Sequence, residues 1–318
     1  MSTWSSHSGI SFIILSFNRK DELARTLDVL SQIDMLEHEI IVVDNASTDG
    51  SPEMVESRYT AVRLIILPTN VGIAGWNAGF AAARMPYFFV LDDDSWPLSG
   101  CAERCIEVME ARPSCGIVAC SIMDEEGNLI GPHDGQGANM RNFIGCGAVI
   151  RRALYDCIGG FDSRIFLYVH ELEYSIRTLQ AGYSIEYCAE ARVVHAQSLR
   201  NRDAEGAIST RYLYHANKGE FYLFLRFFPM KNVAFRIARM LAGRLAFAMG
   251  HGHFFTAFHA IMSGLILGWR SRNTRTLLSP SMSRMFGHGD FSGGFFGPRG
   301  LAYRNPIRRL RSVWKGAE

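Results

Sequence analysis

The first half of the chain alternates between short apolar runs and segments in which Leu or Ala recurs at helical spacing. The apolar runs have the length of strands. The predicted strands are residues 10–15, 39–43, 63–67 and 87–91, and the predicted helices between them are residues 20–31 and 73–84. This alternation is typical of βαβ units joined by right-handed crossovers. It predicts an α/β fold in which helices flank a mostly parallel sheet.

The alternation continues to about residue 200 and then gives way to a different pattern. The further predicted elements are a helix over 99–111, strands over 116–121 and 145–151, a helix over 170–181 and a strand over 184–188. Beyond them, seven aromatic residues crowd a helical stretch that ends at Pro229. Residues 231–270 are predicted to form one or two amphipathic helices, and residues 271–318 to be loosely ordered.

One segment of the second half is long and apolar enough to raise the question of a membrane span. Leu245–Trp269 contains no Lys, Arg, Asp or Glu. It is interrupted by polar or small residues, namely His251, His253, His259, Gly250, Gly252, Gly264 and Gly268. These interruptions favour a helix lying in the membrane interface, or a self-packed helical hairpin, over a transmembrane helix.

The composition is that of a globular protein, but its charge is unevenly distributed. Of the 318 residues 48% are apolar and 20% are charged, which excludes a disordered chain, a collagen-like repeat and a disulfide-stapled miniprotein. Residues 231–318 hold 14 Lys and Arg against 2 Asp and Glu, whereas residues 1–230 hold 19 against 29. A strongly basic segment after an acidic body suits an anionic surface as partner.

The seven cysteines indicate a reducing compartment. They include no CxxC pair, and their odd number disfavours a closed set of disulfides. We expect most of them to be small core residues. The first residues, MSTWSSHSG, show no basic region followed by an apolar stretch, so a secretory signal is not expected and the predicted compartment is the cytoplasm.

Polar residues follow each of the four predicted N-terminal strands. The clusters are Ser16–Arg19, Asp44–Ser47, Asn70–Gly79 and Asp92–Asp94. The carboxyl ends of parallel strands lie at one edge of a sheet, where α/β proteins bind ligands. Turn chemistry alone explains Asn or Asp at any single strand end, but hardly at all four together.

The triple aspartate is the sharpest of these signals. Asp92 and Asp94 point to the same side of an extended chain, and two close carboxylates repel each other unless a cation lies between them or one is protonated. Carboxylate oxygens suit Mg²⁺ or Mn²⁺. The alternative is an acidic turn or a cap for the following helix.

The stretch NVGIAGWNAG carries glycines at 72, 75 and 79. Glycines allow close approach of a ligand or of another backbone, and a helix that begins here could face a phosphate. Packing of a helix on a strand explains these glycines equally well. The stretch is neither a Walker loop nor GxGxxG.

Seven stretches follow one another in order between residues 10 and 200, namely IILSFNR, IIVVDNASTDGS, PTNVGIAGWNAGF, FFVLDDDSWP, GCGAVIRRALYDCIGGFDSRIF, VHELEYSIRTLQAGY and ARVVHAQS. Their order and spacing resemble those of the family-2 inverting glycosyltransferases, and the aromatic segment 212–229 is similar to the rhamnosyl- and galactofuranosyltransferase branch. The resemblance implies a GT-A fold with a Rossmann-like sheet, a nucleotide-sugar donor and Mn²⁺ or Mg²⁺. It suggests a catalytic domain over residues 1–205 and a basic, aromatic helical extension over residues 206–318.

The resemblance also assigns roles to single positions. The implied donor contacts are Ser16, Asn18, Asp44, Asn70, Gly72, Asn77 and Asp92, and the implied metal ligands are Asp92, Asp94 and His195. Many relatives have Thr where this chain has Ser16, a change that keeps the hydroxyl. Without the resemblance, a lone His after a strand, such as His195, is more often structural.

The implied catalytic base is Glu171. Relatives carry an acidic pair followed by a further acid, and the second member of the pair is usually the base. This chain reads His170-Glu171-Leu172-Glu173, so His170 replaces the first acid. Glu173 stands four residues before Arg177, where an ion pair on one helix face is expected.

The remaining expectations concern partners. We expect a glycan or lipid-linked saccharide as acceptor, with dTDP-rhamnose as the first choice of donor and UDP-galactofuranose as the second. The extension is expected to rest on the inner face of the cell membrane, with homodimerisation as its alternative, and a nucleic-acid partner is not expected. The loop Gly131–Gly137 and the pair Arg200 and Arg202 are more simply surface segments than acceptor or diphosphate contacts.

Two other functions compete with sugar transfer. A nucleotidyltransferase could use a similar sheet and acidic metal site, and would not need Glu171. A non-catalytic membrane-bound scaffold would be expected to have lost its site residues. The presence of Asp44, Asp92, Asp94 and Glu171 favours an enzyme over a scaffold.

Overall fold

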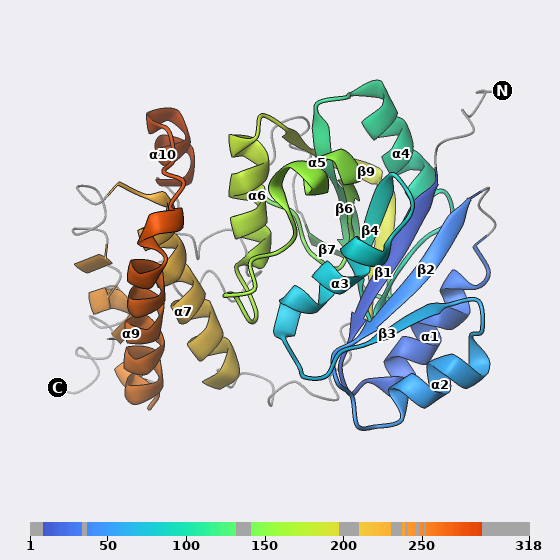
Figure 1. Cartoon of the computed structure of the whole chain (residues 1–318), viewed down its shortest axis with the longest axis horizontal. Helices are drawn as coiled ribbons and strands as arrows, with labels where there is room; N and C mark the ends of the chain where they lie inside the picture. Colours follow the sequence, from blue (N-terminus) through green and yellow to red (C-terminus); the bar gives the residue numbers. More distant parts are fainter. Residues whose placement is uncertain are drawn as a thin grey trace. The chain divides into compact units, whose positions relative to one another are not determined.

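The computed structural model describes residues 9–33, 37–131, 141–196, 210–229 and 252–287, with short helical pieces at 237–238, 241–245 and 248–250 (Figure 1). The chain divides into two compact units. One comprises Met1–Phe166 and His170–Asn201, and the other comprises Leu167–Val169 and Arg202–Glu318.

The first unit is built on a mixed sheet. Its strands are β1 (Ile10–Ser16), β2 (His38–Asp44), β3 (Arg63–Ile66), β4 (Tyr87–Asp92), β5 (Ser95–Pro97), β6 (Cys115–Met123), β7 (Leu129–Gly131), β8 (Ala148–Arg151) and β9 (Ser184–His195). They follow the order β3-β2-β1-β4-β8-β6-β9-β5, with β7 paired to β6. Strand β8 is antiparallel to β4 and β6, and β9 is parallel to β6. Six of the nine strands in the described part of the chain therefore point the same way, as the sequence predicts.

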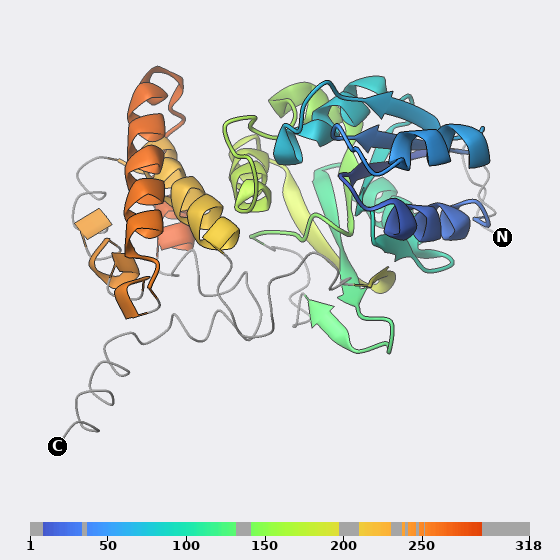
Figure 2. The same ribbon diagram turned by 90° about the horizontal axis from the view of Figure 1, so that it is seen from below.

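Helices cover both faces of this sheet (Figure 2). They are α1 (Lys20–Leu30), α2 (Ser51–Arg58), α3 (Trp76–Ala82), α4 (Cys101–Ala111), α5 (Arg152–Ile158) and α6 (His170–Gln180). Alternate strand residues separate the faces: Phe12 and its stacking partner Phe89 join the core cluster under α1, α2 and α4, whereas Phe88 packs on Phe80 of α3 and Tyr155 of α5. Strands that are buried on both faces read as continuous apolar runs, which explains why the pattern located them.

The short elements were not predicted. Helix α2 has eight residues with a proline in its first turn, strand β5 has three residues, and α5 follows β8 without a break. The prediction also ended β9 at residue 188, but the strand continues to His195. Its pairing with β6 shifts between Cys120 and Ser121, which are matched by Cys188 and Arg192. This irregularity interrupts the period of two on which the prediction depends.

The second unit contains α7 (Thr210–Phe227), α9 (Phe254–Arg270) and α10 (Pro280–Gly287). Helices α7 and α9 pack against each other through small residues. An added Cβ at Gly264 would lie 2.4 Å from the carbonyl oxygen of Lys218, and one at Gly268 would lie 2.6 Å from Cβ of Leu225. The expectation of loose order over 271–318 is wrong for α10, and residues 288–318 lie outside the described residues. Across the described segments no helix is both long and apolar enough to cross a membrane.

The contact at Gly264 gives a stability prediction. Replacing Gly by Ala inside a helix ordinarily adds about 1 kcal/mol of stability. Because the new methyl group of Gly264→Ala would collide with the backbone of α7, we expect that variant to lower the free energy of unfolding by about 1–3 kcal/mol. The matched control is Gly243→Ala, whose added Cβ would meet nothing within 4 Å. Urea unfolding followed by circular dichroism measures both; equal stabilities would mean that the two helices do not pack this closely.

Candidate functional site

The parallel pairing of three strands brings their polar ends side by side. Ser16 at the end of β1 pairs with Asp44 at the end of β2, and Leu15 pairs with Asp92 at the end of β4. The structure thus brings together three of the residues that the sequence selects. They lie at the carboxyl edge of the sheet, where ligands bind in this class of fold.

Asp44 sits in a network of backbone hydrogen bonds. The N–H of Ser47 donates to Oδ2 of Asp44 (2.8 Å), the N–H of Asn18 donates to Oγ of Ser47 (2.9 Å), and the N–H of Thr48 donates to Oδ1 of Asn18 (2.7 Å). Asn18 and Ala46 have positive φ, a strained conformation that is common at binding loops. Asp44 is 1% exposed, and among the described residues its Oδ1 accepts no hydrogen bond. A buried acceptor without a donor suits a ligand N–H or hydroxyl.

Asn45 holds the loop that contains Asn70 and Gly72. Its Oδ1 accepts from the N–H of Val71 (2.9 Å), and its Nδ2 donates to the carbonyl of Gly72 (3.0 Å). Asn70 uses its Oδ1 to accept from the N–H of Gly72 (2.9 Å). Sequence reasoning missed this role of Asn45, for which its place directly after a predicted strand was the available signal.

The three glycines of the stretch Asn70–Gly79 are required for different structural reasons. Gly72 has φ +64°, and an added Cβ would lie 2.0 Å from the carbonyl oxygen of Phe166. Gly75 and Gly79 instead allow close packing on the sheet, with an added Cβ 2.4 Å from Leu15 and 2.3 Å from Ile13. The packing explanation that the sequence left open is therefore correct for Gly75 and Gly79.

Asn77 is occupied by backbone contacts. Its Nδ2 donates to the carbonyl of Phe161 (2.8 Å), and its Oδ1 accepts from the N–H of Phe161 (2.7 Å). These two bonds fix the turn at Gly160 and Phe161. The structure therefore does not bring the Asn77 amide among the groups at the strand ends, and its role in shaping the pocket stays a prediction.

The acidic turn after β4 is held against the end of β9. Oγ of Ser95 accepts from the N–H of Asp92 (2.9 Å), and the carbonyl of Asp94 accepts from the N–H of Ala196 (2.9 Å). Antiparallel pairing of β5 with β9 sets Ser95 opposite His195. This pairing places the imidazole of His195 next to the carboxylates.

His195 contacts both predicted metal-binding aspartates. Its Nε2 lies 3.1 Å from Oδ1 of Asp94 and 3.9 Å from Oδ2 of Asp92. Burial opposes protonation of His195, but Cys146 and Asp94 raise its pKa to about 11. Burial likewise opposes ionisation of Asp94, yet His195 and Arg19 hold the pKa of Asp94 well below its usual range. A field that holds a proton on His195 this firmly also attracts a metal cation.

Arg19 is a further functional residue that sequence reasoning did not single out. Its Nη2 donates to Oδ2 of Asp94 (2.8 Å), and its Nε lies 3.3 Å from Oδ1 of Asp93. Burial raises the pKa of Asp93 to about 8, opposed by Arg19, and it raises the pKa of Asp92 to about 6, opposed by His195. Among the described residues, Arg19 pairs with Asp93 and Asp94, whereas the ion-pair partner of Asp92 is His195 at 3.9 Å.

The donor atoms at this point fit a divalent cation. One ligand atom each from Asp92, His195 and Cys146 all lie within 4.8 Å of one another, and Asp94 is in contact with His195. Carboxylate oxygen and imidazole nitrogen are ordinary ligands of Mn²⁺ and related ions. The sequence treated Cys146 as a core residue, and the structure places it at the edge of the site.

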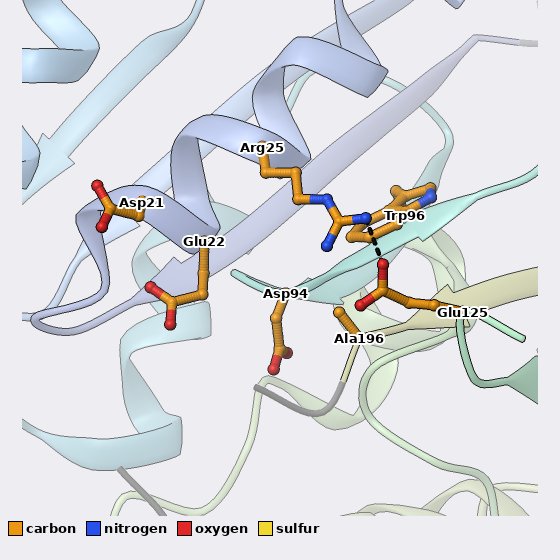
Figure 3. A pocket seen from close by; sticks show the side chains of 7 residues that line it. All are labelled: Asp21, Glu22, Arg25, Asp94, Trp96, Glu125 and Ala196. Carbon is orange, nitrogen blue, oxygen red and sulfur yellow. Dashed lines mark hydrogen bonds and ion pairs between the residues drawn. The ribbon is translucent and has the colours of Figure 1, made fainter. Parts of the chain in front are cut away.

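A pocket of about 390 Å³ opens beside Asp94 (Figure 3). Asp21, Glu22, Arg25, Trp96, Glu125 and Ala196 complete its lining. Arg25 reaches across it from α1 to pair with Glu125, and its guanidinium lies 4.8 Å from the ring centre of Trp96. Of the residues selected from the sequence, Asp94 reaches this pocket.

Glu171 lies at the start of α6 and faces the same edge. Its Oε2 is 3.2 Å from Nδ1 of His170, and its charge contributes to the raised pKa of Asp92. The ring of His170 is stacked on Trp76 (5.8 Å between centres) and meets Phe161 edge-on. An added Cβ at Gly145 would lie 3.5 Å from Oε1 of Glu171, so the missing side chain leaves space beside this oxygen.

The neighbouring acid on the same helix has the structural role that the sequence predicts. Both oxygens of Glu173 accept from Arg177 at 2.8 Å, and Arg177 also donates to the carbonyls of Ile158 and Gly160. Arg200, Arg202 and the loop beyond Gly131 lie outside the described residues.

Comparisons with known proteins agree with this architecture. Residues 11–168 match the model of glycosyl transferase family 2. The chain is 23% identical to the O-antigen chain rhamnosyltransferase WbaN of Salmonella anatum, over 67% of this chain and 78% of WbaN. It is 24% identical to the N-acetylglucosaminyl-diphospho-decaprenol L-rhamnosyltransferase of Mycobacterium tuberculosis, over 58% of this chain and 74% of that protein.

A solved structure with a similar fold is the mannosyltransferase PcManGT from Pyrobaculum calidifontis, in complex with GDP-Man and Mn²⁺. The TM-score is 0.55 at 16% identity, covering 97% of this chain and 84% of that chain. The predicted GT-A fold class is confirmed. Some matched proteins are much longer: the chain covers 17% of the O-antigen biosynthesis protein RfbC of Myxococcus xanthus and 38% of the TarS chain of S. aureus.

Gly72 gives a prediction for the loop. Gly72→Ala has two costs: alanine must adopt a positive φ, and its Cβ collides with the carbonyl of Phe166. Gly100→Ala has the first cost alone, since Gly100 (φ +76°) has nothing within 4 Å of its added Cβ. We expect Gly100→Ala to cost about 1–2 kcal/mol of stability. We expect Gly72→Ala to cost a further 1–3 kcal/mol or so, because the backbone must move. Denaturant unfolding measures the stability of both variants. Equal losses of stability would show that the backbone at Phe166 moves away from the new side chain at little cost.

Proposed function

Because the chain belongs to glycosyl transferase family 2, we propose that it transfers a sugar from a nucleoside-diphosphate donor to an acceptor hydroxyl with inversion at the anomeric carbon. One observation carries the proposal: Asp92, Asp94 and His195 lie together at the sheet edge, and Glu171 lies close enough to Asp92 for its charge to act on it. A cation site beside a separate carboxylate suits this reaction. The metal site assists the leaving group, and the carboxylate activates the nucleophile.

The donor would bind along the ends of β1, β2 and β4. The buried Oδ1 of Asp44, which has no hydrogen-bond donor among the described residues, would accept a hydrogen bond from the nucleoside, with Ser16 and Asn18 beside it. The loop of Asn70 and Gly72, held by Asn45, would lie beside the same bound donor. A divalent cation bound by Asp92, Asp94 and His195 would supply Lewis-acid stabilisation of the departing diphosphate.

Glu171 would take the proton from the acceptor hydroxyl. One carboxylate oxygen lies 3.2 Å from Nδ1 of His170, and the absence of a side chain at Gly145 leaves space beside the other. General-base catalysis of this kind contributes about 10²–10⁴-fold. Direct displacement needs one base and inverts the anomeric centre, in contrast to the two carboxylates of a glycosidase.

The relatives suggest a setting for the reaction. Named rhamnosyltransferases of O-antigen and of a decaprenol-linked saccharide, and the galactofuranosyltransferase GlfT1, are among them. We propose dTDP-rhamnose as the first candidate donor and UDP-galactofuranose as the second. The acceptor would be a glycan or lipid-linked saccharide of cell-surface polysaccharide synthesis.

Nucleotide binding tests the proposal directly. We expect UDP or dTDP with Mn²⁺ to raise the melting temperature of the wild type, since a ligand at a hundred times its Kd adds about 2.7 kcal/mol of stability. Asp94→Ala is expected to lose this shift. Glu171→Gln is expected to keep it and to lose at least a hundredfold in the release of nucleoside diphosphate from the matching nucleotide-sugar.

Glu173→Gln separates a catalytic role from a structural one. It removes one charge from the same helix but breaks a buried ion pair, so it should lower the melting temperature without abolishing turnover below that temperature. Near-normal turnover of Glu171→Gln would refute the base assignment. A folded protein that no pyrimidine or purine diphosphate stabilises, with or without Mn²⁺, would refute the proposed function.

We also propose that the second unit binds the surface of an anionic membrane through α9. The glycines of α9 face α7 and Ile261 is buried, whereas five of its large apolar residues are exposed: Phe255, Phe258, Met262, Ile266 and Trp269. Phe255 is 84% exposed and Trp269 is 58% exposed. Residues 252–287 contain four arginines and no Asp or Glu. An exposed apolar stripe in a segment that carries arginines and no acidic residue matches an interface with anionic lipid.

Flotation with vesicles tests this surface. We expect the protein to float with phosphatidylglycerol-containing vesicles, less so at high salt, and not with neutral vesicles. The double variant Phe255→Ser/Trp269→Ser should float poorly, whereas Leu98→Ser, an exposed apolar residue of the first unit, should float like the wild type. A wild-type protein that does not float would refute the proposed membrane binding. A dimer in solution that the double variant dissociates would refute it too, and would show that a second copy of the chain covers this face.

A further inference from the structure

We propose that Cys146 is a ligand of the divalent cation and gives the site a preference for thiophilic ions. Its sulfur, a carboxylate oxygen of Asp92 and a ring nitrogen of His195 all lie within 4.8 Å of one another. Ligand atoms 2.0–2.3 Å from one ion in a tetrahedral arrangement lie about 3.3–3.8 Å apart, so a closing movement of these side chains by about an ångström would bring all three onto one ion. The inference rests on the cation that the proposed function requires, and it concerns which ion the site selects.

The backbone around Cys146 holds the thiol in this place. The N–H of Gly147 donates to the carbonyl of Ile144 (3.2 Å), and the carbonyl of Gly147 accepts from the N–H of Cys120 on β6 (3.0 Å). An added Cβ at Gly147 would lie 2.4 Å from Ile122, so the absence of a side chain lets the segment approach β6 closely. Cys146 itself is 3% exposed. A thiol fixed this firmly needs little reorganisation to bind an ion.

The surroundings of Cys146 differ from those of the other cysteines. Cys101, Cys105 and Cys120 form a group of thiols with one another, and Cys115 donates to the carbonyl of Ile117. Cys157 is exposed. Among the described cysteines, Cys146 is the one grouped with a carboxylate and an imidazole. A cysteine that serves only to fill a core has no need of such neighbours.

The two aspartates of the site are not equivalent, and this makes room for the thiol. Asp94 directs one oxygen to Arg19 (2.8 Å) and the other to His195 (3.1 Å). Asp92 and His195 then share their open side with Cys146. An oxygen, nitrogen and sulfur donor set binds Co²⁺, Zn²⁺ or Cd²⁺ in preference to Mg²⁺, because thiolate is a soft ligand. The thiol releases its proton to solvent when the ion binds.

Titration with Co²⁺ tests the assignment without any substrate. In the reduced full-length protein, Co²⁺ should produce the near-ultraviolet charge-transfer absorption of a cobalt–thiolate bond. Cys146→Ser should lose this absorption. Because loss of an outer-shell partner already weakens metal binding about 10- to 100-fold, loss of a direct ligand should weaken Co²⁺ binding by at least that factor. Asp92→Asn should also weaken the binding, because it removes a ligand of the same ion. Mg²⁺ should compete with Co²⁺ better in Cys146→Ser than in the wild type.

Cys105→Ala is the matched control, since it removes a thiol from the other group. It should keep the cobalt–thiolate absorption. If Cys146→Ser does not fold, Cys146→Ala replaces it as the variant without the thiol. Absorption that survives in both Cys146 variants, disappears in Cys105→Ala, or is absent from the wild type would overturn the assignment. A wild type without the absorption whose melting temperature still rises with nucleotide and Mn²⁺ would refute the role of Cys146 alone. Loss of both responses would refute the proposed function as well.

Discussion

The candidate site depends on one short contact, the antiparallel pairing of β5 with the last residues of β9. This pairing brings His195 against a turn of three aspartates that lies about a hundred residues earlier in the chain. Without it, Asp92 and Asp94 would end a strand with no imidazole beside them. The three-residue strand β5 therefore positions the whole site. The Ser95 hydroxyl holds the turn before this strand by accepting a hydrogen bond from the N–H of Asp92.

The electrostatics of the turn follow from three neighbouring acids, of which Asp93 and Asp94 are buried whereas Asp92 is partly exposed. Burial raises the pKa of Asp92 to about 6 and that of Asp93 to about 8, whereas Asp94, which contacts both Arg19 and His195, stays ionised. A bound cation would relieve this repulsion and displace the proton of His195. The arrangement that is unfavourable without a cation would thus stabilise a bound metal and, through it, the diphosphate of the proposed donor.

In the second unit, small residues give α9 an unusual orientation. Helices of globular proteins bury their large apolar side chains, but the glycines at 264 and 268 bring α9 so close to α7 that its small residues form the contact. Ile261 is buried, but five large apolar side chains remain exposed. Residues 252–287 hold four arginines and no Asp or Glu, and for this reason we propose a membrane surface as the partner of this face.

The sequence by itself determined the long elements and the candidate chemistry. Continuous apolar runs located β1, β2 and β4, and the acids at their ends identified Asp44, Asp92 and Asp94, because these signals are local in the chain. The tertiary structure decided what was not local: that Asn77 is occupied by the Phe161 backbone, that Asn45 and Arg19 hold neighbouring groups, and that Cys146 lies beside His195. Each of these depends on a contact between residues 26 or more positions apart, set by strand pairing and close packing. No periodicity along the chain encodes such a contact, since it arises only when separate elements compete for the same space.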